Sequence, residues 1–372
     1  MPNPGAISTH FPAPAYQRQD DVFRTAFGLL QQGISDSAFP CASVAITHRG
    51  ALVGLKALGR FTYEPQSTEA TPASIFDIAS VSKVVATTAT AMILYERGLL
   101  DVEMPVAAVL PEFAGEDARR RDVTVHMLLA HSSGLPAYEK LFLRARADEL
   151  LRAAFTMPLV AEPGTRAAYS DIGFIVLGAA LERIADESLD RFCQREVFGP
   201  LGMVHTAYNP APAWKALIPP TANDVAFRGR VIQGEVQDEN CSVVGGVAGH
   251  AGLFATAQDI AVFAEAMLTC VHRIVRPETL AFFTRRESSP AGNSHALGWD
   301  TPSSPSQSGR HFSAASFGHL GYTGTSLWID PECKLSITLL TNRTWPDCSS
   351  QKIKEVRPKF HDAVVEALLS TR

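Results

Sequence analysis

The feature that most constrains the fold of this chain is where strand-like and helix-like patterns fall along its 372 residues. Short apolar runs typical of strands occur near the two ends, at residues 41–48 and 51–58 and again at 319–341, whereas helical periodicity dominates from about 75 to 270. This distribution predicts one sheet assembled from both ends of the chain, with a mainly helical region inserted between them. A cleft is expected where the two parts meet.

The same patterns predict the domain limits. Residues 1–16 are rich in proline and small residues and are expected to form an extended arm, and residues 17–372 a single domain. Within it, 17–75 and 275–372 are assigned to the sheet part and 76–274 to the mainly helical part. A helix is expected to begin at Asp20 or Asp21, and a last amphipathic helix to cover residues 351–369.

Composition narrows the class of partner. With 46% hydrophobic and 19% charged residues, the chain can bury a large core and is expected to be a soluble globular protein. A net charge of -5 gives no basic field for nucleic acid or an anionic membrane, and no stretch is apolar enough to span one. A small-molecule partner is therefore expected, and the oligomeric state is left open.

Two further features of the sequence bear on compartment and metal content. The first twelve residues lack the basic start and apolar core of a secretory signal, which favours a cytoplasmic location, or a periplasmic or secreted one if a leader has been removed. The six cysteines are scattered without a Cys-x-x-Cys pair, so neither a zinc site nor a disulfide framework is predicted.

A candidate nucleophile stands where an apolar helix is expected to begin. Ser80 and Lys83 are three residues apart and so share one helical face, which brings the amine within reach of the hydroxyl. Residues 84–95 carry no charge, so the helix is expected to be buried and the pKa of Lys83 to be lowered by desolvation. A lysine of this kind can act as a base near neutral pH.

The chain contains a second Ser-x-x-Lys sequence, Ser349 to Lys352, so the spacing alone is weak evidence for a catalytic pair. It leads into a charge-rich stretch, where the serine is interpreted as a helix cap and the lysine as solvated. Burial alone leaves a catalytic and a structural role equally open for Ser80 and Lys83.

Two later segments could face the same cleft. Tyr169 and Asp171 are two residues apart in a turn ahead of a helix, so their side chains are expected to project to the same side. Residues 317–324 are expected to form an edge strand along the cleft, with glycines that allow a ligand to approach the backbone.

The order Ser80-x-x-Lys83, Tyr169-x-Asp171 and His319-Leu320-Gly321 resembles the three motifs of the penicillin-recognising serine hydrolases. This superfamily includes class C β-lactamases, D-alanyl-D-alanine carboxypeptidases and β-lactamase-like esterases. Residues 123–136 and 249–254 resemble it as well, so the likeness covers nearly the whole chain. It implies an α/β fold of the β-lactamase/transpeptidase type, in which an antiparallel sheet is flanked by helices.

The resemblance also implies an acyl-enzyme mechanism without metal or other cofactor. Ser80 would attack a carbonyl carbon, Lys83 or Tyr169 would take its proton, and Tyr169 would pass a proton to the leaving group. The backbone amides of Ser80 and Tyr322 would form the oxyanion hole, with Leu320 and Gly321 in the same substrate-binding segment.

Two departures from the family pattern bear on mechanism and substrate. Asp171 replaces the usual Asn, and a carboxylate beside Lys83 would hold the lysine protonated and shift the base role toward Tyr169, unless Asp171 is itself protonated. His319 and Leu320 replace a Lys-Thr pair that helps to hold the carboxylate of β-lactams, and histidine is mostly neutral at pH 7. Small esters are therefore ranked first as substrates, D-alanyl peptides second and β-lactams third.

Several other polar residues are interpreted as structural. His126 and His131 have no acidic partner at metal spacing, so no metal site is predicted. Asp238 and His250 are expected to pin a loop near the cleft. Glu239 and Asn240 are assigned to the same loop, and Trp299 and Trp328 are interpreted as aromatic residues of the core or of the cleft wall.

The rival hypothesis is a non-catalytic ligand-binding or sensor protein on the same fold. The presence of Ser80, Lys83 and Tyr169 together counts against it, because a binding module does not need the whole set. The absence of a Gly-x-Ser-x-Gly sequence argues against an α/β-hydrolase.

Overall fold

A six-stranded sheet forms the base of the computed structural model, which describes residues 13–144, 146–269 and 274–370. Its strands, in spatial order, are β1 (Ala13–Pro14), β3 (Ala51–Gly59), β2 (Cys41–His48), β11 (Leu335–Thr341), β10 (Ser326–Asp330) and β9 (Phe317–Leu320). The central pair β2 and β11 joins the two ends of the chain, with Val44 opposite Leu339. The sheet built from both ends is therefore confirmed.

The sheet is mixed rather than wholly antiparallel. The five longer strands pair antiparallel, as expected, but β1 pairs parallel with β3. Ala13 and Pro14, at the end of the expected arm, form this edge strand, and the preceding twelve residues lie outside the described part of the chain.

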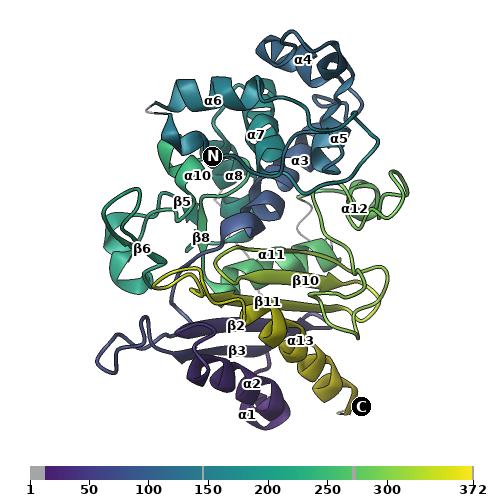
Figure 1. Cartoon of the computed structure of the whole chain (residues 1–372). Helices are drawn as coiled ribbons and strands as arrows, with labels where there is room; N and C mark the ends of the chain where they lie inside the picture. Colours follow the sequence, from purple (N-terminus) through teal and green to yellow (C-terminus); the bar gives the residue numbers. More distant parts are fainter. Residues whose placement is uncertain (1–12, 145, 270–273, 371–372) are drawn as a thin grey trace, which may run out of the picture.

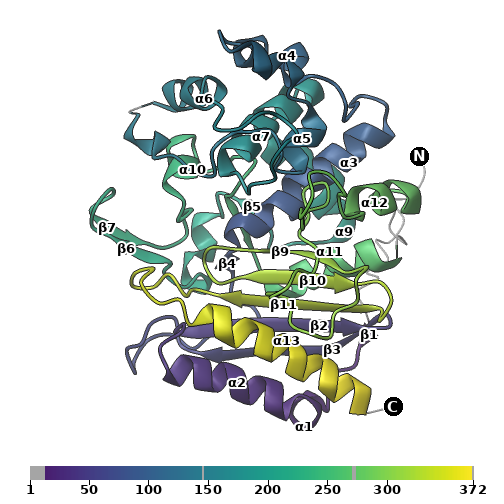
Figure 2. The ribbon, with the colours of Figure 1, turned by 45° about the vertical axis from the view of Figure 1, so that its right-hand side comes forward.

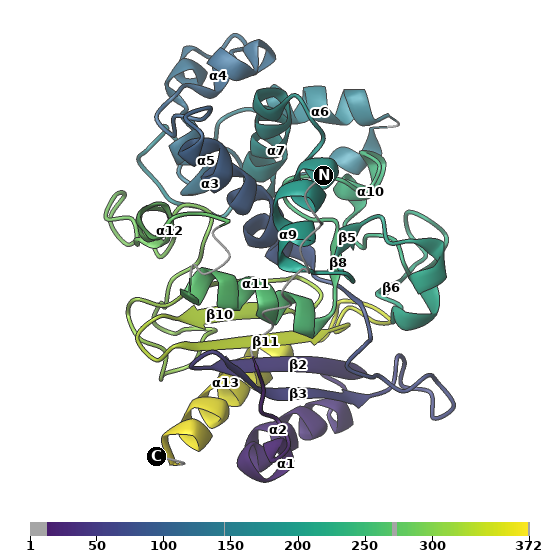
Figure 3. The same ribbon diagram turned by 180° about the vertical axis from the view of Figure 1, so that it is seen from behind.

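Helices cover both faces of the sheet. Helices α2 (Arg24–Ser35) and α13 (Ile353–Ser370) pack on one face and α11 (Ala257–Thr269) on the other, as Figures 1 and 3 show. Side chains of β2 alternate between them, so Val44 and Ile46 join the cluster under α2 and α13 while Ala45 joins the larger core. Both faces of this strand are therefore buried.

The mainly helical region lies on the α11 side of the sheet (Figure 2). Its helices are α3 (Ala89–Glu96), α4 (Val106–Val109), α5 (Val125–Leu129), α6 (Ala147–Phe155), α7 (Asp171–Ala185), α8 (Leu189–Cys193), α9 (Gly199–Leu201) and α10 (Glu239–Val243). A small sheet of β4 (Phe76–Asp77), β8 (Leu253–Ala255) and β5 (Ala207–Tyr208), and a hairpin of β6 (Ala222–Asp224) and β7 (Arg230–Ile232), complete it. Helices α1 (Gln19–Val22) and α12 (Pro277–Thr284) are the remaining α-helices of the described residues.

Two helices cross the boundaries expected from sequence. Helix α11 falls within 76–274 yet packs on β2, β10 and β11, and α12 falls within 275–372 yet packs on α3, where the rings of Tyr95 and Phe282 stack 5.5 Å apart. Apolar periodicity predicts that such helices are buried, but it does not say which surface buries them.

The segment after Ser80 departs from a regular α-helix. A 3-10 turn (Ala79–Val81) leads into a π-helical stretch (Lys83–Thr88), and only then into α3. Every residue from Lys83 to Leu94 is buried, as the uncharged sequence predicts. Short π-helical stretches are frequent at functional sites, where they shift the side chains by one position.

We expect one buried histidine to make the fold sensitive to acid. His361 on α13 has its Nδ1 atom 3.1 Å from Ser308 O, and burial lowers its pKa to about 3. In the unfolded chain the histidine is protonated below about pH 6.5, whereas in the folded protein it stays neutral until the pH is far lower. The free energy of unfolding therefore decreases as the pH falls, by about 2 kcal/mol at pH 5. The His361→Gln protein should show a smaller fall in Tm between pH 7 and pH 5, measured by circular dichroism. Equal falls in both proteins would contradict this expectation.

Candidate active site

A cavity of about 730 Å³ opens between the sheet and the helical region. Nine residues singled out from the sequence line it: Ser80, Tyr169, Asp171, Asp238, Glu239, His319, Leu320, Gly321 and Tyr322. Lys83 lies beneath this lining, with its side chain fully buried. The structure thus brings the three sequence segments together around one cavity.

Ser80 contacts both of the groups that could move its proton. Its Oγ atom lies 3.0 Å from Lys83 Nζ and 2.9 Å from Tyr169 Oη. Both are hydrogen-bond distances, and they satisfy the geometric requirement for a nucleophile next to a base.

Lys83 is held by three acceptors. Its Nζ atom donates to Ser80 Oγ at 3.0 Å, to Asp171 Oδ1 at 2.6 Å and to the backbone oxygen of His250 at 2.9 Å. Burial lowers the pKa of Lys83, and the carboxylate of Asp171 opposes part of that change. The net direction is downward, so the amine releases a proton more readily than an exposed lysine does.

Asp171 also acts on the tyrosine. It begins α7, where the side chain of Ser170 caps the helix by accepting from Gly173 N. Asp171 Oδ1 lies 3.2 Å from Tyr169 Oη, and burial together with this negative charge holds the pKa of Tyr169 well above its usual value. The tyrosine therefore remains a neutral phenol, which suits a proton donor better than a base.

The backbone in front of Ser80 is constrained. Ala79 has a φ of 47°, a left-handed conformation that is costly for a residue with a side chain. Asp77 supports it by accepting from Ala79 N at 2.9 Å, and it accepts from Gln237 N at 2.7 Å. Burial raises the pKa of Asp77 to about 6. The role of this acid had no signal in the sequence.

The segment after β9 is tied to the strand that precedes Ser80. Thr323 Oγ1 donates to Asp77 O at 2.8 Å, and Thr325 Oγ1 donates to Ile78 O at 2.9 Å. These two bonds fix the turn that contains Tyr322 beside Ser80, where their backbone amides are expected to form the oxyanion hole.

His319 lies on the edge strand β9 and is buried. Burial lowers its pKa to about 4, so the ring is neutral at pH 7, as the sequence indicated. A neighbouring pair in the cavity wall, in which His295 Nδ1 lies 2.8 Å from Asp300 Oδ1, was not foreseen from any motif. The third motif therefore lies near a carboxylate, that of Asp300.

His131 supports Tyr169 from below. Its ring packs against Tyr169 and Phe174 at centroid distances of 4.8 and 5.0 Å, and its Nδ1 atom accepts from Ser170 N at 3.1 Å. Burial holds its pKa well below the usual value. A neutral ring with one nitrogen already bonded fits the structural role expected from the sequence.

Two arginines in the far wall of the cavity were not singled out. Arg343 and Arg357 are only 6% and 4% exposed, and neither pairs with a carboxylate of the described residues. Arg343 Nε donates to Tyr322 O at 2.7 Å, and Arg357 Nη2 donates to Thr325 O. Burial and the neighbouring Arg343 lower the pKa of Arg357 to about 9.

The remaining sequence candidates lie in other surroundings. Ser349 and Lys352 lie outside the core ahead of α13, and Lys352 Nζ donates to Asp36 O. Trp299 and Trp328 are buried core residues. Within the described ranges, no set of His, Cys, Asp or Glu side chains could hold a metal ion, and no described helix is both long and apolar enough to cross a membrane.

Ser80 thus lies beside a buried amine and a phenol, in a cavity between a helix-flanked sheet and a helical region. The model of the family described as Beta-lactamase matches residues 26–355. This chain therefore belongs to the beta-lactamase family, and the superfamily resemblance noted in the sequence is confirmed.

Curated relatives match over most of the chain. A protein of Bacillus subtilis (strain 168) named N-acetylmuramyl-L-alanine amidase is 32% identical over 345 residues, which cover 82% of this chain and 78% of the relative. A protein of Salmonella agona (strain SL483) named "Putative D-alanyl-D-alanine carboxypeptidase" is 30% identical over 367 residues, which cover 88% of this chain and 84% of the relative. The relatives support a serine hydrolase, as expected.

A solved structure confirms the fold. EstCE1, described as a hydrolase with promiscuous acyltransferase activity, superimposes with a TM-score of 0.78 at 22% identity, and the match covers 93% of this chain and 99% of that one. At this identity the likeness concerns the fold alone.

Proposed function

We propose that this chain hydrolyses a small ester or amide through an acyl intermediate on Ser80. The observation that carries the proposal is that Ser80 Oγ lies within hydrogen-bond distance of Lys83 Nζ and Tyr169 Oη in the wall of the 730 Å³ cavity. A binding or sensor protein has no need of this arrangement.

In acylation, Lys83 takes the proton of Ser80 as Oγ attacks the carbonyl carbon. The negative charge that develops on the carbonyl oxygen is stabilised by the backbone amides of Ser80 and Tyr322. Tyr169 then gives its phenol proton to the leaving oxygen or nitrogen as the scissile bond breaks.

In deacylation, a water molecule gives a proton to the Tyr169 phenolate and attacks the acyl carbon. Ser80 Oγ leaves and regains its proton from Lys83, which restores the starting state. The lowered pKa of Lys83 and the raised pKa of Tyr169 support this division of roles, in which Lys83 is the base, contrary to the shift toward Tyr169 that Asp171 led us to expect.

Small esters are the first proposed substrates. His319 is neutral and Leu320 has no hydroxyl, so the third motif lacks the groups that the resemblance associates with β-lactam carboxylates. The adjacent Asp300 carboxylate adds negative charge there, which disfavours an anionic group at this wall.

Amide bonds in carboxylate-bearing peptides are the second candidate. Arg343 and Arg357 form a pair of buried positive charges without a carboxylate partner among the described residues, and a substrate anion could compensate them. The names of the two curated relatives, an amidase and a carboxypeptidase, point the same way.

A parallel assay separates these substrates. The purified protein is given a short-chain p-nitrophenyl ester, a D-alanyl-D-alanine peptide, a muramyl-L-alanine amide and a chromogenic cephalosporin. We expect turnover of the ester and slow or no turnover of the cephalosporin. Fast cephalosporin turnover with an inert ester would overturn the ranking, and peptide or amide turnover well above that of the ester would establish the second candidate.

The Asp171→Asn variant tests which group acts as base. Because the Asp171 carboxylate raises the pKa of Lys83, removing its charge lowers that pKa, and the neutral amine then persists to lower pH. We expect the acid limb of kcat/KM against pH to move down by about 1–3 units for ester hydrolysis. An unmoved limb would show that Lys83 is not the titrating base.

A further inference from the structure

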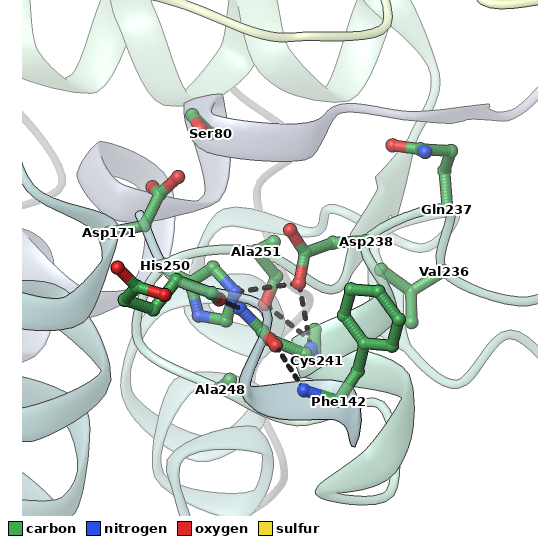
Figure 4. A network of polar contacts seen from close by, with 12 residues as sticks. Ser80, Phe142, Asp171, Val236, Gln237, Asp238, Cys241, Ala248, His250 and Ala251 are labelled. Carbon is green, nitrogen blue, oxygen red and sulfur yellow. Dashed lines mark hydrogen bonds and ion pairs between the residues drawn. The ribbon is translucent and has the colours of Figure 1, made fainter. Parts of the chain in front are cut away.

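His250 lies directly behind Lys83 and is only 1% exposed. Its Nε2 atom is 2.8 Å from Asp238 Oδ1, and the same carboxylate oxygen accepts from Cys241 N at 2.7 Å and so caps α10. Figure 4 shows both contacts as dashed lines meeting at Asp238, below Ser80 and Asp171. The pair therefore links the His250 loop to the start of a helix.

The backbone around His250 has little freedom. Thr87 Oγ1 donates to Gly249 O at 2.6 Å, and Gly249 packs so closely on α7 that an added Cβ would lie 2.1 Å from Phe174 O. On the other side, Cys241 Sγ donates to Ala251 O at 3.4 Å. The His250 side chain adds a direct contact between this loop and Asp238.

The position of the His250 loop affects Lys83 because the number of hydrogen bonds that the lysine amine can donate depends on its protonation. A protonated lysine has three N–H donors and finds three acceptors here, whereas a neutral amine has two donors and one lone pair. If Asp171 and His250 O take the two donors, the lone pair is directed at Ser80 Oγ. The position of His250 O thus decides whether the base points at its target.

We propose that the Asp238–His250 pair is a positioning device for Lys83. It holds the His250 carbonyl where it orients the amine toward Ser80. The proposal rests on the proposed function, because it concerns the acylation step on Ser80. Asp238 lines the cavity whereas His250 does not, so the His250 variants give the cleaner test of an effect on the rate of acylation rather than on binding.

Paired variants at each residue separate positioning from simple support. His250→Ala removes the contact, whereas His250→Gln keeps an amide N–H that can reach Asp238. Asp238→Ser keeps a cap for α10 but is too short to reach the ring, whereas Asp238→Asn keeps both bonds. Should His250→Ala fail to fold, the Asp238 pair still provides the test.

The readouts are the rate at which a fluorophosphonate labels Ser80, with loss of fluoride, and the separate kcat and KM for a p-nitrophenyl ester. We expect His250→Ala and Asp238→Ser to slow labelling and lower kcat on the order of 10- to 100-fold with little change in KM, because small misplacements of a base are costly. His250→Gln and Asp238→Asn should recover most of the rate. The matched control is His311→Ala, which breaks a histidine–acid pair with Glu366 on the surface, and it should label at the wild-type rate.

The possible outcomes separate the two proposals. Folded His250→Ala and Asp238→Ser proteins that label as fast as wild type, even with a lower Tm, would overturn the positioning role and leave the proposed function intact. Wild-type protein that takes no label on Ser80 would instead remove the proposed function on which the inference rests.

Discussion

Replacing Lys83 by methionine will lower kcat/KM for ester hydrolysis by about 10²- to 10⁴-fold, the usual contribution of a positioned base. Methionine has a similar length and fits a site where the side chain is fully buried, so the change removes the amine rather than the packing. It also leaves the Asp171 carboxylate without its partner at 2.6 Å, so a lower Tm is expected. Activity is measured on protein shown to be folded by circular dichroism.

The chain provides a matched control for this variant. Lys352 occupies the same place in the second Ser-x-x-Lys sequence but is exposed, and its amine donates to the backbone of Asp36. Lys352→Met should retain wild-type kcat/KM. A folded Lys83→Met protein with near wild-type turnover would contradict the assignment of Lys83 as base.

Placing a methyl group on Gly321 will lower kcat/KM by about 10²- to 10³-fold, the range observed when an oxyanion-hole donor is lost. A Cβ at this position would lie 1.9 Å from Thr325 Oγ1 and 2.6 Å from Ile78 O. The second atom belongs to the backbone two residues before Ser80, so the two segments must separate. The Gly321→Ala change would therefore move the Tyr322 amide away from the Ser80 amide.

This prediction also has a control within the chain. A methyl group added at Gly28 in α2 would meet no neighbouring atom within 4 Å, and the backbone there has no left-handed φ, so Gly28→Ala should leave both activity and fold intact. Stopped-flow measurement of p-nitrophenol release will separate acylation from deacylation in both variants. A Gly321→Ala protein with an unchanged acylation rate would rule out Tyr322 as an oxyanion donor.

The sequence was sufficient where a pattern has a direct physical cause. The uncharged run after Lys83 predicts burial, and burial lowers the pKa of Lys83 as expected. The spacing of Tyr169 and Asp171 predicts that their side chains project to the same side, and Tyr169 Oη lies 3.2 Å from Asp171 Oδ1. Strands at both ends of the chain predict the β2–β11 pairing.

The sequence was insufficient where the contact is made by the backbone or where the partner is far along the chain. Any residue type could supply the carbonyl of His250 that accepts from Lys83, so no residue identity signals it. The support of Ala79 by Asp77 and the approach of Gly249 to α7 likewise depend on tertiary packing. Apolar periodicity could not place α11 on the sheet for the same reason.

The cavity walls carry charge that the motifs alone do not convey. Asp300 lies beside His319 on one wall, and the buried Arg343 and Arg357 lie in the other. A substrate in the cavity meets a carboxylate at one wall and two guanidinium groups at the other. The ester and the carboxylate-bearing amide are compared directly for this reason.

The central claim is that Ser80 is the nucleophile, and intact-protein and peptide mass spectrometry after exposure to a fluorophosphonate tests it most directly. We expect a single adduct on the peptide containing Ser80, its loss in Ser80→Ala, and its retention in Ser349→Ala. An adduct on another residue, or none on Ser80 in folded wild-type protein that hydrolyses the ester, would contradict the assignment.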